Sequence, residues 1–168
     1  MTPTFWTFVG FLFSILAGLL YALKPGHPYL GALALIASGV FDVLDGAVAR
    51  VMHRVSKAGA FNDSTLDRLA EVVVYAGIID GAYTSSLLVL LALAFSLLVS
   101  YTRAKGDSLG VSLSGVGIGE RAERLLVLIV FSIAGYVWIG VAIVLLLALL
   151  TFVQRYLAIL QKLRPQKT

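Results

Sequence analysis

The residues of this chain best suited to chemistry are four aspartates, Asp42, Asp45, Asp63 and Asp67, which stand among strongly apolar segments. Carboxylate oxygens without histidine or cysteine suit hard divalent cations such as Mg²⁺, Mn²⁺ or Ca²⁺. Two such ions about 3.5 to 4 Å apart clamp the attacking and leaving oxygens in many phosphoryl-transfer sites. If the fold gathers these side chains, the chemistry they favour is metal-assisted phosphoryl transfer.

The amino-acid composition indicates which secondary-structure elements position these aspartates. Of the 168 residues, 60% are hydrophobic and only 13% are charged, and the mean hydropathy is +0.96. Soluble domains are typically about 45–50% apolar and about 25% charged. We therefore predict an all-α integral membrane protein, because helices satisfy their own backbone hydrogen bonds in lipid. The chain has no cysteine, which excludes disulfides and thiolate metal sites.

The length allows six membrane-spanning helices of about 20 residues each in a single domain covering residues 1–168. In chain order the expected spans are Phe5 to Leu23, Tyr29 to His53, Ala60 to Ile79, Ser85 to Arg103, and two spans within Glu120 to Leu160. The glycine- and serine-rich segment from Lys105 to Gly119 is expected to be a loop. Residues 125–154 carry no charge, and we divide them into two spans near Gly135 to Gly140.

The distribution of basic residues supports this division. With six spans, the connections after the second and fourth spans and the C-terminal segment, Arg155 included, carry most of the lysines and arginines, and the opposite side receives only Lys24. The positive-inside rule then puts both termini in the cytoplasm. The net charge of +4 reflects topology and attraction to lipid headgroups. A chain that is mostly membrane span is not expected to bind nucleic acid.

Helical spacing brings the aspartates together. Asp42 and Asp45 are three residues apart and share a face of the second span, whereas Asp63 and Asp67 are four apart and share a face of the third. Both pairs lie near the cytoplasmic ends of their spans. Four anions so placed repel one another unless a cation joins them, so we expect divalent metal. A cation or proton transporter, or an internal ion-pair network, is the alternative that these residues leave open.

Small residues and one arginine accompany the aspartates. Gly46 and Gly59 leave room for a ligand beside the two helices, and Arg50 lies one turn beyond Gly46 on the same face. An arginine in that position can form paired hydrogen bonds to a diphosphate.

The spacing D-x2-D-G-x2-A-R-x8-G-x3-D-x3-D from residue 42 to residue 67 resembles the signature of the CDP-alcohol phosphotransferase family at all eight fixed positions. Members of that family are six-span membrane enzymes that transfer a phosphoalcohol from a CDP-alcohol to an acceptor hydroxyl and release CMP. The resemblance implies that Asp42, Asp45 and Asp63 are the principal metal ligands, and that Asp67 is both a ligand and the general base. It implies two Mg²⁺ or Mn²⁺ ions and a CDP pocket formed by Asp42, Gly46, Ala49, Arg50 and Gly59.

Two shorter stretches indicate the acceptor. "SYTRAKGDSLGV" from Ser100 and "GERAERL" from Gly119 resemble the phosphoinositol-phosphate synthase branch of the family, which includes archaetidylinositol phosphate synthases and uses inositol 1-phosphate. The cations expected to bind the acceptor phosphate are Arg103, Lys105, Arg121 and Arg124. Such cations also extend to lipid headgroups without binding substrate. Glycerol 3-phosphate would satisfy the same phosphate argument.

We therefore expect a phospholipid-synthesising transferase in the cell membrane with its active site facing the cytoplasm. It would move the phospholipid moiety of CDP-archaeol or CDP-diacylglycerol to inositol 1-phosphate and release CMP. The location follows from solubility, because the donor's tails stay in the bilayer while the sugar phosphate arrives from the cytosol. We also expect a homodimer.

Overall fold

The structure is a computed structural model, and it describes residues 3–23, 25–51 and 56–164; of residues 3, 4, 49 and 50 it describes the backbone alone. The described residues form six α-helices and no strand. The helices are α1 Pro3–Leu23, α2 Pro28–Val51, α3 Lys57–Asp80, α4 Ser86–Ser108, α5 Arg121–Ile133 and α6 Val137–Leu163. The predicted all-helical class is confirmed.

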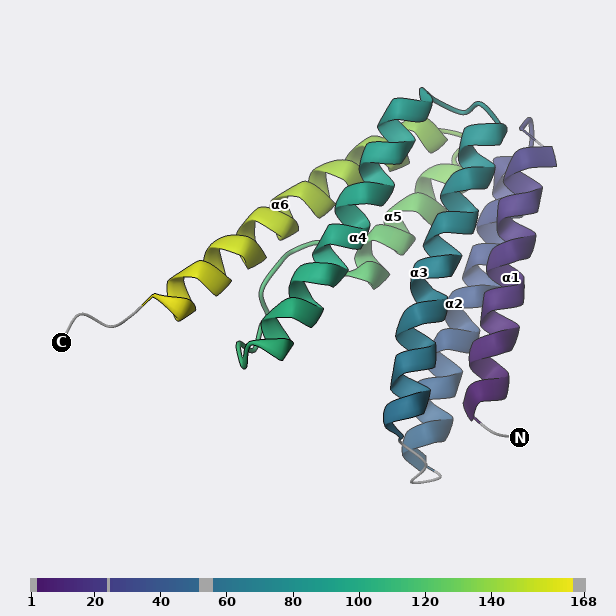
Figure 1. The fold of residues 1–168 in the computed structure, drawn as a ribbon. Helices are drawn as coiled ribbons and strands as arrows, with labels where there is room; N and C mark the ends of the chain where they lie inside the picture. The colour runs from purple at the N-terminus through teal and green to yellow at the C-terminus, as the bar shows by residue number, and fades with distance from the viewer. Residues whose placement is uncertain (1–2, 24, 52–55, 165–168) are drawn as a thin grey trace.

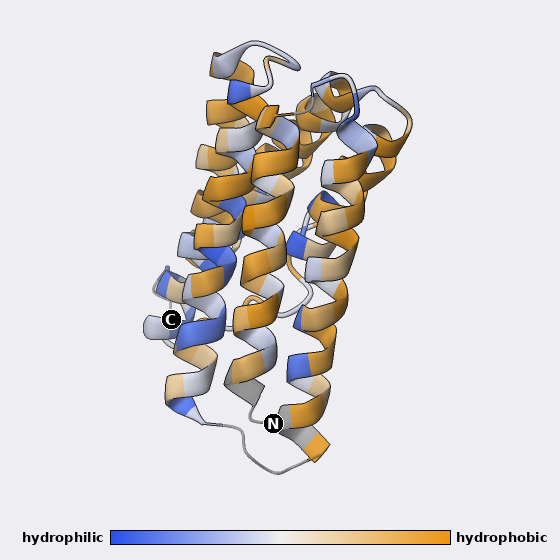
Figure 2. Cartoon of the chain, turned by 90° about the vertical axis from the view of Figure 1, so that its right-hand side faces the viewer, coloured by the Kyte–Doolittle hydropathy of each residue, from blue (hydrophilic) through white to orange (hydrophobic). Residues whose placement is uncertain are grey.

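The helices form two groups that diverge toward one end (Figure 1). Helices α1, α2 and α3 pack side by side, α4 packs on α6, and α5 lies against both α2 and α6. Helix α1 begins at the end where α2 ends, α3 begins and α6 ends. The hydrophilic segments gather toward this end, and the opposite half is mostly hydrophobic (Figure 2).

Four helices, α1, α2, α4 and α6, have the length and apolar composition needed to cross a membrane. Helix α3 has 24 residues but carries the charged residues of the site, and α5 has only 13. At 1.5 Å per residue α5 is about 20 Å long, less than the roughly 30 Å hydrocarbon core. The six expected helices are therefore present, and four of them have the character of complete spans.

The segment before α5 differs from its prediction. Helix α4 continues to Ser108, so the first part of the expected loop is helical. Residues 109–120 then fold back into the bundle, where Val111 and Leu113 are buried and the backbone N–H of Gly119 donates to Oγ1 of Thr151 at 2.8 Å. This inward course explains why α5 is short. The expected division of the last apolar stretch is confirmed at Gly135, which has a φ of 81° between α5 and α6, whereas Gly140 lies within α6.

Glycines hold α1 directly against α3. A Cβ at Gly77 would overlap the backbone carbonyl of Gly18, and a Cβ at Gly18 would lie 2.6 Å from the carbonyl oxygen of Val73. Both obstructing atoms belong to the backbone and cannot rotate away. This contact fixes the height of α3 relative to α1, and with it the height of every side chain on α3.

Replacing Gly77 with alanine should therefore lower stability by about 1–3 kcal/mol, because the added methyl group forces two helix backbones apart. Thermal unfolding of the purified protein in detergent would measure the effect. The matched control is Gly26→Ala, since nothing lies within 4 Å of a Cβ at that position. An unchanged melting temperature for Gly77→Ala would contradict the close packing of α1 on α3.

Candidate metal and substrate site

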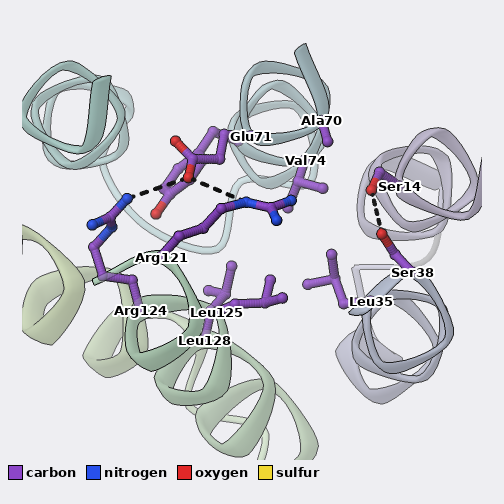
Figure 3. A pocket seen from close by; sticks show the side chains of 11 residues that line it. Ser14, Leu35, Ser38, Ala70, Glu71, Val74, Arg121, Arg124, Leu125 and Leu128 are labelled. Carbon is purple, nitrogen blue, oxygen red and sulfur yellow. Dashed lines mark hydrogen bonds and ion pairs between the residues drawn. The ribbon is translucent and has the colours of Figure 1, made fainter. Parts of the chain in front are cut away.

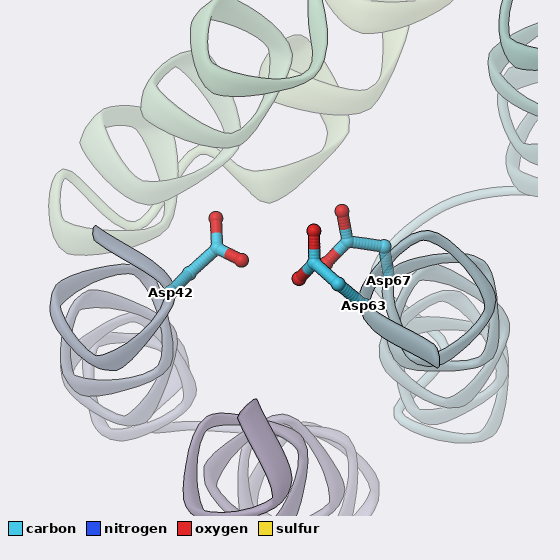
Figure 4. A group of neighbouring side chains, drawn as sticks. All are labelled: Asp42, Asp63 and Asp67. Carbon is cyan, nitrogen blue, oxygen red and sulfur yellow. The ribbon is translucent and has the colours of Figure 1, made fainter. Parts of the chain in front are cut away.

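Helices α2 and α3 bring three aspartates together. Asp42 points from α2 toward Asp63 and Asp67 on α3 (Figure 4), and one carboxylate oxygen from each of the three lies within 4.8 Å of the others. The first turn of α3 is held by the Ser56 side chain, which accepts a hydrogen bond from the N–H of Gly59 at 3.0 Å. The three half-buried carboxylates could hold a divalent metal ion, since their oxygens are the hard donors such ions prefer.

Asp45 lies outside this closest group, one turn further along α2. It is 7% exposed, and its Oδ2 has no hydrogen-bond partner among the described residues. Oδ1 of Asp63 is likewise buried and has no hydrogen-bond partner among the described residues. Burying a carboxylate oxygen without a partner is costly. The residues present therefore fit a divalent cation, which would satisfy such oxygens.

Two arginines balance the charge of the aspartates. Nη1 of Arg121, in the first turn of α5, lies 3.0 Å from Oδ2 of Asp42 and 2.9 Å from Oδ1 of Asp67. Arg68 on α3 contacts Oδ2 of Asp67 at 3.4 Å and donates to the Ser100 hydroxyl on α4. Arg121, predicted to bind the acceptor phosphate, thus lies within the acidic cluster itself, because residues 109–120 carry the start of α5 into the bundle.

The other three predicted acceptor cations occupy different environments. Arg124 is buried, with Nη2 at 3.3 Å from Oε1 of Glu71 and Nη1 donating to the Gly119 carbonyl at 2.6 Å. Arg103 and Lys105 are exposed near the end of α4. Of these two, only Arg103 lines the cleft described next.

A cleft of about 1080 Å³ opens between the two helix groups and reaches the aspartates. Its acidic wall includes Asp42, Asp63 and Asp67. Its basic residues are Arg68, Arg103, Arg121, Arg124 and Arg155. Leucines of α3, α4 and α5 line further parts, so the cleft joins a polar end to apolar surface. This combination suits a ligand with charged and lipid portions.

Arg155 was not predicted as a site residue. It is 3% exposed and donates to the carbonyls of Val99 at 3.0 Å and Val116 at 2.9 Å, and it pairs with Glu120 at 3.3 Å. From the sequence, Arg155 was expected only to belong to the basic C-terminal segment. Its position within an apolar helix, two turns before the end of α6, was the signal that could have identified it.

The predicted CDP pocket is described in part. Asp42 lines the cleft, Gly46 lies on α2 one residue beyond Asp45, and Gly59 lies in the first turn of α3. The side chains of Ala49 and Arg50 lie outside the described part of the chain. Their role stays a prediction.

Known proteins are similar to this chain over most of its length. The sequence model of the family described as CDP-alcohol phosphatidyltransferase matches residues 1–161. The archaetidylinositol phosphate synthase of Methanothermobacter thermautotrophicus is 44% identical over 164 residues, covering 94% of this chain and 83% of that protein. The synthase of the same name from Pyrococcus horikoshii is 37% identical over 155 residues, covering 92% of this chain and 81% of the relative.

Solved structures show the same fold. The phosphatidylinositol phosphate synthase PgsA1 of Mycobacterium tuberculosis with CDP-DAG bound superposes with a TM-score of 0.84 at 26% identity, covering 95% of this chain and 86% of that one. The same enzyme in complex with manganese and citrate gives a TM-score of 0.85 at 26% identity, with coverages of 95% and 83%. The chain belongs to the CDP-alcohol phosphatidyltransferase family. Within that family it is similar to the archaetidylinositol phosphate and phosphatidylinositol phosphate synthases.

Asp63 offers the clearest test of the metal site, because it forms no ion pair with an arginine among the described residues. Asp63→Asn should weaken Mn²⁺ binding by about tenfold or more, since it removes one charged ligand oxygen. Electron paramagnetic resonance of free Mn²⁺ in a titration of the purified protein would measure this. Asp107→Asn, in the same cleft but on α4, is the control and should bind Mn²⁺ like the parent protein. Equal affinities for both variants would exclude Asp63 as a ligand.

Proposed function

We propose that this enzyme transfers the phospholipid moiety of a CDP-lipid, CDP-archaeol or CDP-diacylglycerol, to a hydroxyl of inositol 1-phosphate and releases CMP. The observation that carries the proposal is the single cleft in which the aspartate cluster and several arginines face each other. The similar proteins named for synthesis of archaetidylinositol phosphate and phosphatidylinositol phosphate support the same product class. The rival hypothesis of a cation or proton transporter explains the acidic residues but not the five arginines that line the same cleft.

The proposed metal ligands are Asp42, Asp45, Asp63 and Asp67, holding two Mg²⁺ or Mn²⁺ ions. The related enzyme crystallised with manganese supports a divalent cation of this kind. When bound, such ions neutralise the diphosphate of the donor and activate the phosphorus toward attack. The chain's own contribution is to hold the four carboxylates on α2 and α3, two helices that both pack on α1.

Asp67 is the proposed general base. It is the deeper of the two α3 aspartates that line the cleft, and it would accept the proton of the acceptor hydroxyl. Arg68 and Arg121 each contact one of its two oxygens. The proposed CDP contacts are Asp42, Gly46, Ala49, Arg50 and Gly59, with the lipid tails along the apolar part of the cleft.

Recognition of a phosphorylated acceptor is proposed for Arg103, Lys105, Arg121 and Arg124. Arg103 is the best placed to reach a soluble ligand, because it is exposed and lines the cleft. Arg121 would contribute its positive charge from beside the aspartates. Glycerol 3-phosphate carries the same phosphate, so it is the second candidate acceptor, and its use would change the product without changing the pocket.

We further propose that the protein is a multi-pass homodimer of the cell membrane and that all six helices lie in the membrane. Both termini and the active site would face the cytoplasm. The positive-inside distribution of lysine and arginine supports this orientation. The cleft lies in the half of the bundle where the hydrophilic segments gather, which suits a site reached by a lipid donor and a cytosolic acceptor.

Asp67→Asn should abolish CMP release while leaving CDP-lipid binding largely intact, because the variant loses the proposed base but keeps most ligand atoms. CMP would be measured by chromatography after incubation with CDP-lipid, inositol 1-phosphate and Mg²⁺. Substantial residual turnover would rule out Asp67 as the base. A transporter would instead carry Mg²⁺ or protons across proteoliposomes without CDP-lipid.

Arg103→Ala should raise the acceptor KM by about tenfold, since a charge-assisted contact contributes roughly 1.5–3 kcal/mol, and should leave the donor KM almost unchanged. Arg164→Ala, an exposed cation just past the end of α6, is the matched control for general attraction to headgroups. Equal effects of the two substitutions would show that Arg103 does not bind the acceptor. Comparing inositol 1-phosphate with glycerol 3-phosphate in the same assay identifies the acceptor.

A further inference from the structure

Glu71 lies one turn beyond Asp67 on α3, and the reaction as proposed gives it no role. Its side chain is 12% exposed. Oε1 lies 3.3 Å from Nη2 of Arg124 and 3.9 Å from Nε of Arg121 (Figure 3), whereas Oε2 is buried without a hydrogen-bond partner among the described residues. An anion at this position therefore has capacity for a further interaction.

Arg121 is attracted from two directions. Its Nη1 contacts Asp42 and Asp67 at 3.0 and 2.9 Å, and its Nε faces Glu71. The oxygens of Asp42 and Asp67 are also those that would hold a divalent cation. A divalent cation and a guanidinium repel each other at such distances, so the arginine and the metal compete for the same two carboxylates.

A cavity beside Arg121 leaves room for its guanidinium to move. This small cavity of about 30 Å³, roughly the volume of one water molecule, lies beside its guanidinium. Its polar side is formed by Glu71 and the hydroxyl pair of Ser14 and Ser38, and leucines and other apolar side chains of α2, α3 and α5 line the rest. A small turn of the guanidinium toward Glu71 would bring it to the polar side of this cavity. The free Oε2 would gain a partner.

We propose that Glu71 is a positioning residue that draws Arg121 toward itself and so keeps the carboxylates of Asp42 and Asp67 available to a divalent cation. Arg124 does not remove the need for this role. Nη2 of Arg124 contacts only Oε1 of Glu71, and its Nη1 donates a hydrogen bond to the Gly119 carbonyl. Arg124 therefore anchors the start of α5 beside Glu71. The inference rests on the proposed function only in taking Asp42 and Asp67 as metal ligands.

The test is Mn²⁺ titration of the purified protein, read by electron paramagnetic resonance, for Glu71→Gln in the parent chain and in an Arg121→Gln background. In the parent, Glu71→Gln should weaken Mn²⁺ binding by roughly threefold to tenfold, because Arg121 then remains on the aspartates. In the Arg121→Gln background the same substitution should have almost no effect. Glu71→Asp keeps the charge and should bind Mn²⁺ like the parent, and Asp80→Asn, an exposed acid at the far end of α3, is the control for general loss of charge.

Three results would overturn the proposal. An unchanged Mn²⁺ affinity in Glu71→Gln would show that Glu71 does not influence the ligands. An equal loss of Mn²⁺ affinity in the parent and in the Arg121→Gln background would show that Glu71 acts through its own charge or through packing, and not through Arg121. Loss in Glu71→Asp equal to that in Glu71→Gln would point to packing alone. If Asp63→Asn also failed to change Mn²⁺ binding, the proposed metal site itself would be wrong. The Asp63 variant therefore separates a failure of the metal site from a failure of the role proposed for Glu71.

Discussion

The structure depends on the need to balance several carboxylates inside an apolar helix bundle. Asp42, Asp63 and Asp67 approach within 4.8 Å, a distance at which like charges repel strongly in a medium of low dielectric constant. Arginines supply the opposite charge from within the same part of the bundle. These side chains reach the site from three helices, α2, α3 and α5, so the electrostatic balance of the site depends on how these helices pack.

The path of residues 109–120 brings an arginine to the aspartates and so helps to balance their charge. A short surface loop would leave the first turn of α5 at the membrane boundary, away from the aspartates. Instead the segment runs inward along α6, where Gly117 lies so close to Thr151 that a Cβ would collide with its methyl group, and where Arg155 holds the Val116 carbonyl. The shortness of α5 is the structural cost of bringing Arg121 to the acidic cluster.

The aspartate cluster could be predicted from the sequence because it depends on local periodicity. Spacings of three and four residues put each pair on one helix face, and the shared membrane boundary puts the pairs at similar depth. The surroundings of Arg121, Glu71 and Arg155 could not be predicted in this way. Their partners are separated from them by many residues, and they meet only because of the irregular segment before α5, whose course no periodic pattern specifies. The same long-range packing leaves Asp45 outside the closest group of oxygens.

The two halves of the bundle, α1 to α3 and α4 with α6, carry different residues of the site. Helices α1 and α3 approach at glycines, where backbone contacts backbone, and the half formed by α1, α2 and α3 carries all three clustered aspartates. The other half, α4 with α6, diverges from it and carries Arg103 and Arg155 along the opposite wall of the cleft. In the proposed reaction, the lipid donor would lie along the apolar part of the cleft, and the acceptor phosphate would be attracted to the arginines that line it. In the proposed reaction, the separation of the halves would therefore set how far the acceptor hydroxyl lies from the carboxylates proposed to activate it.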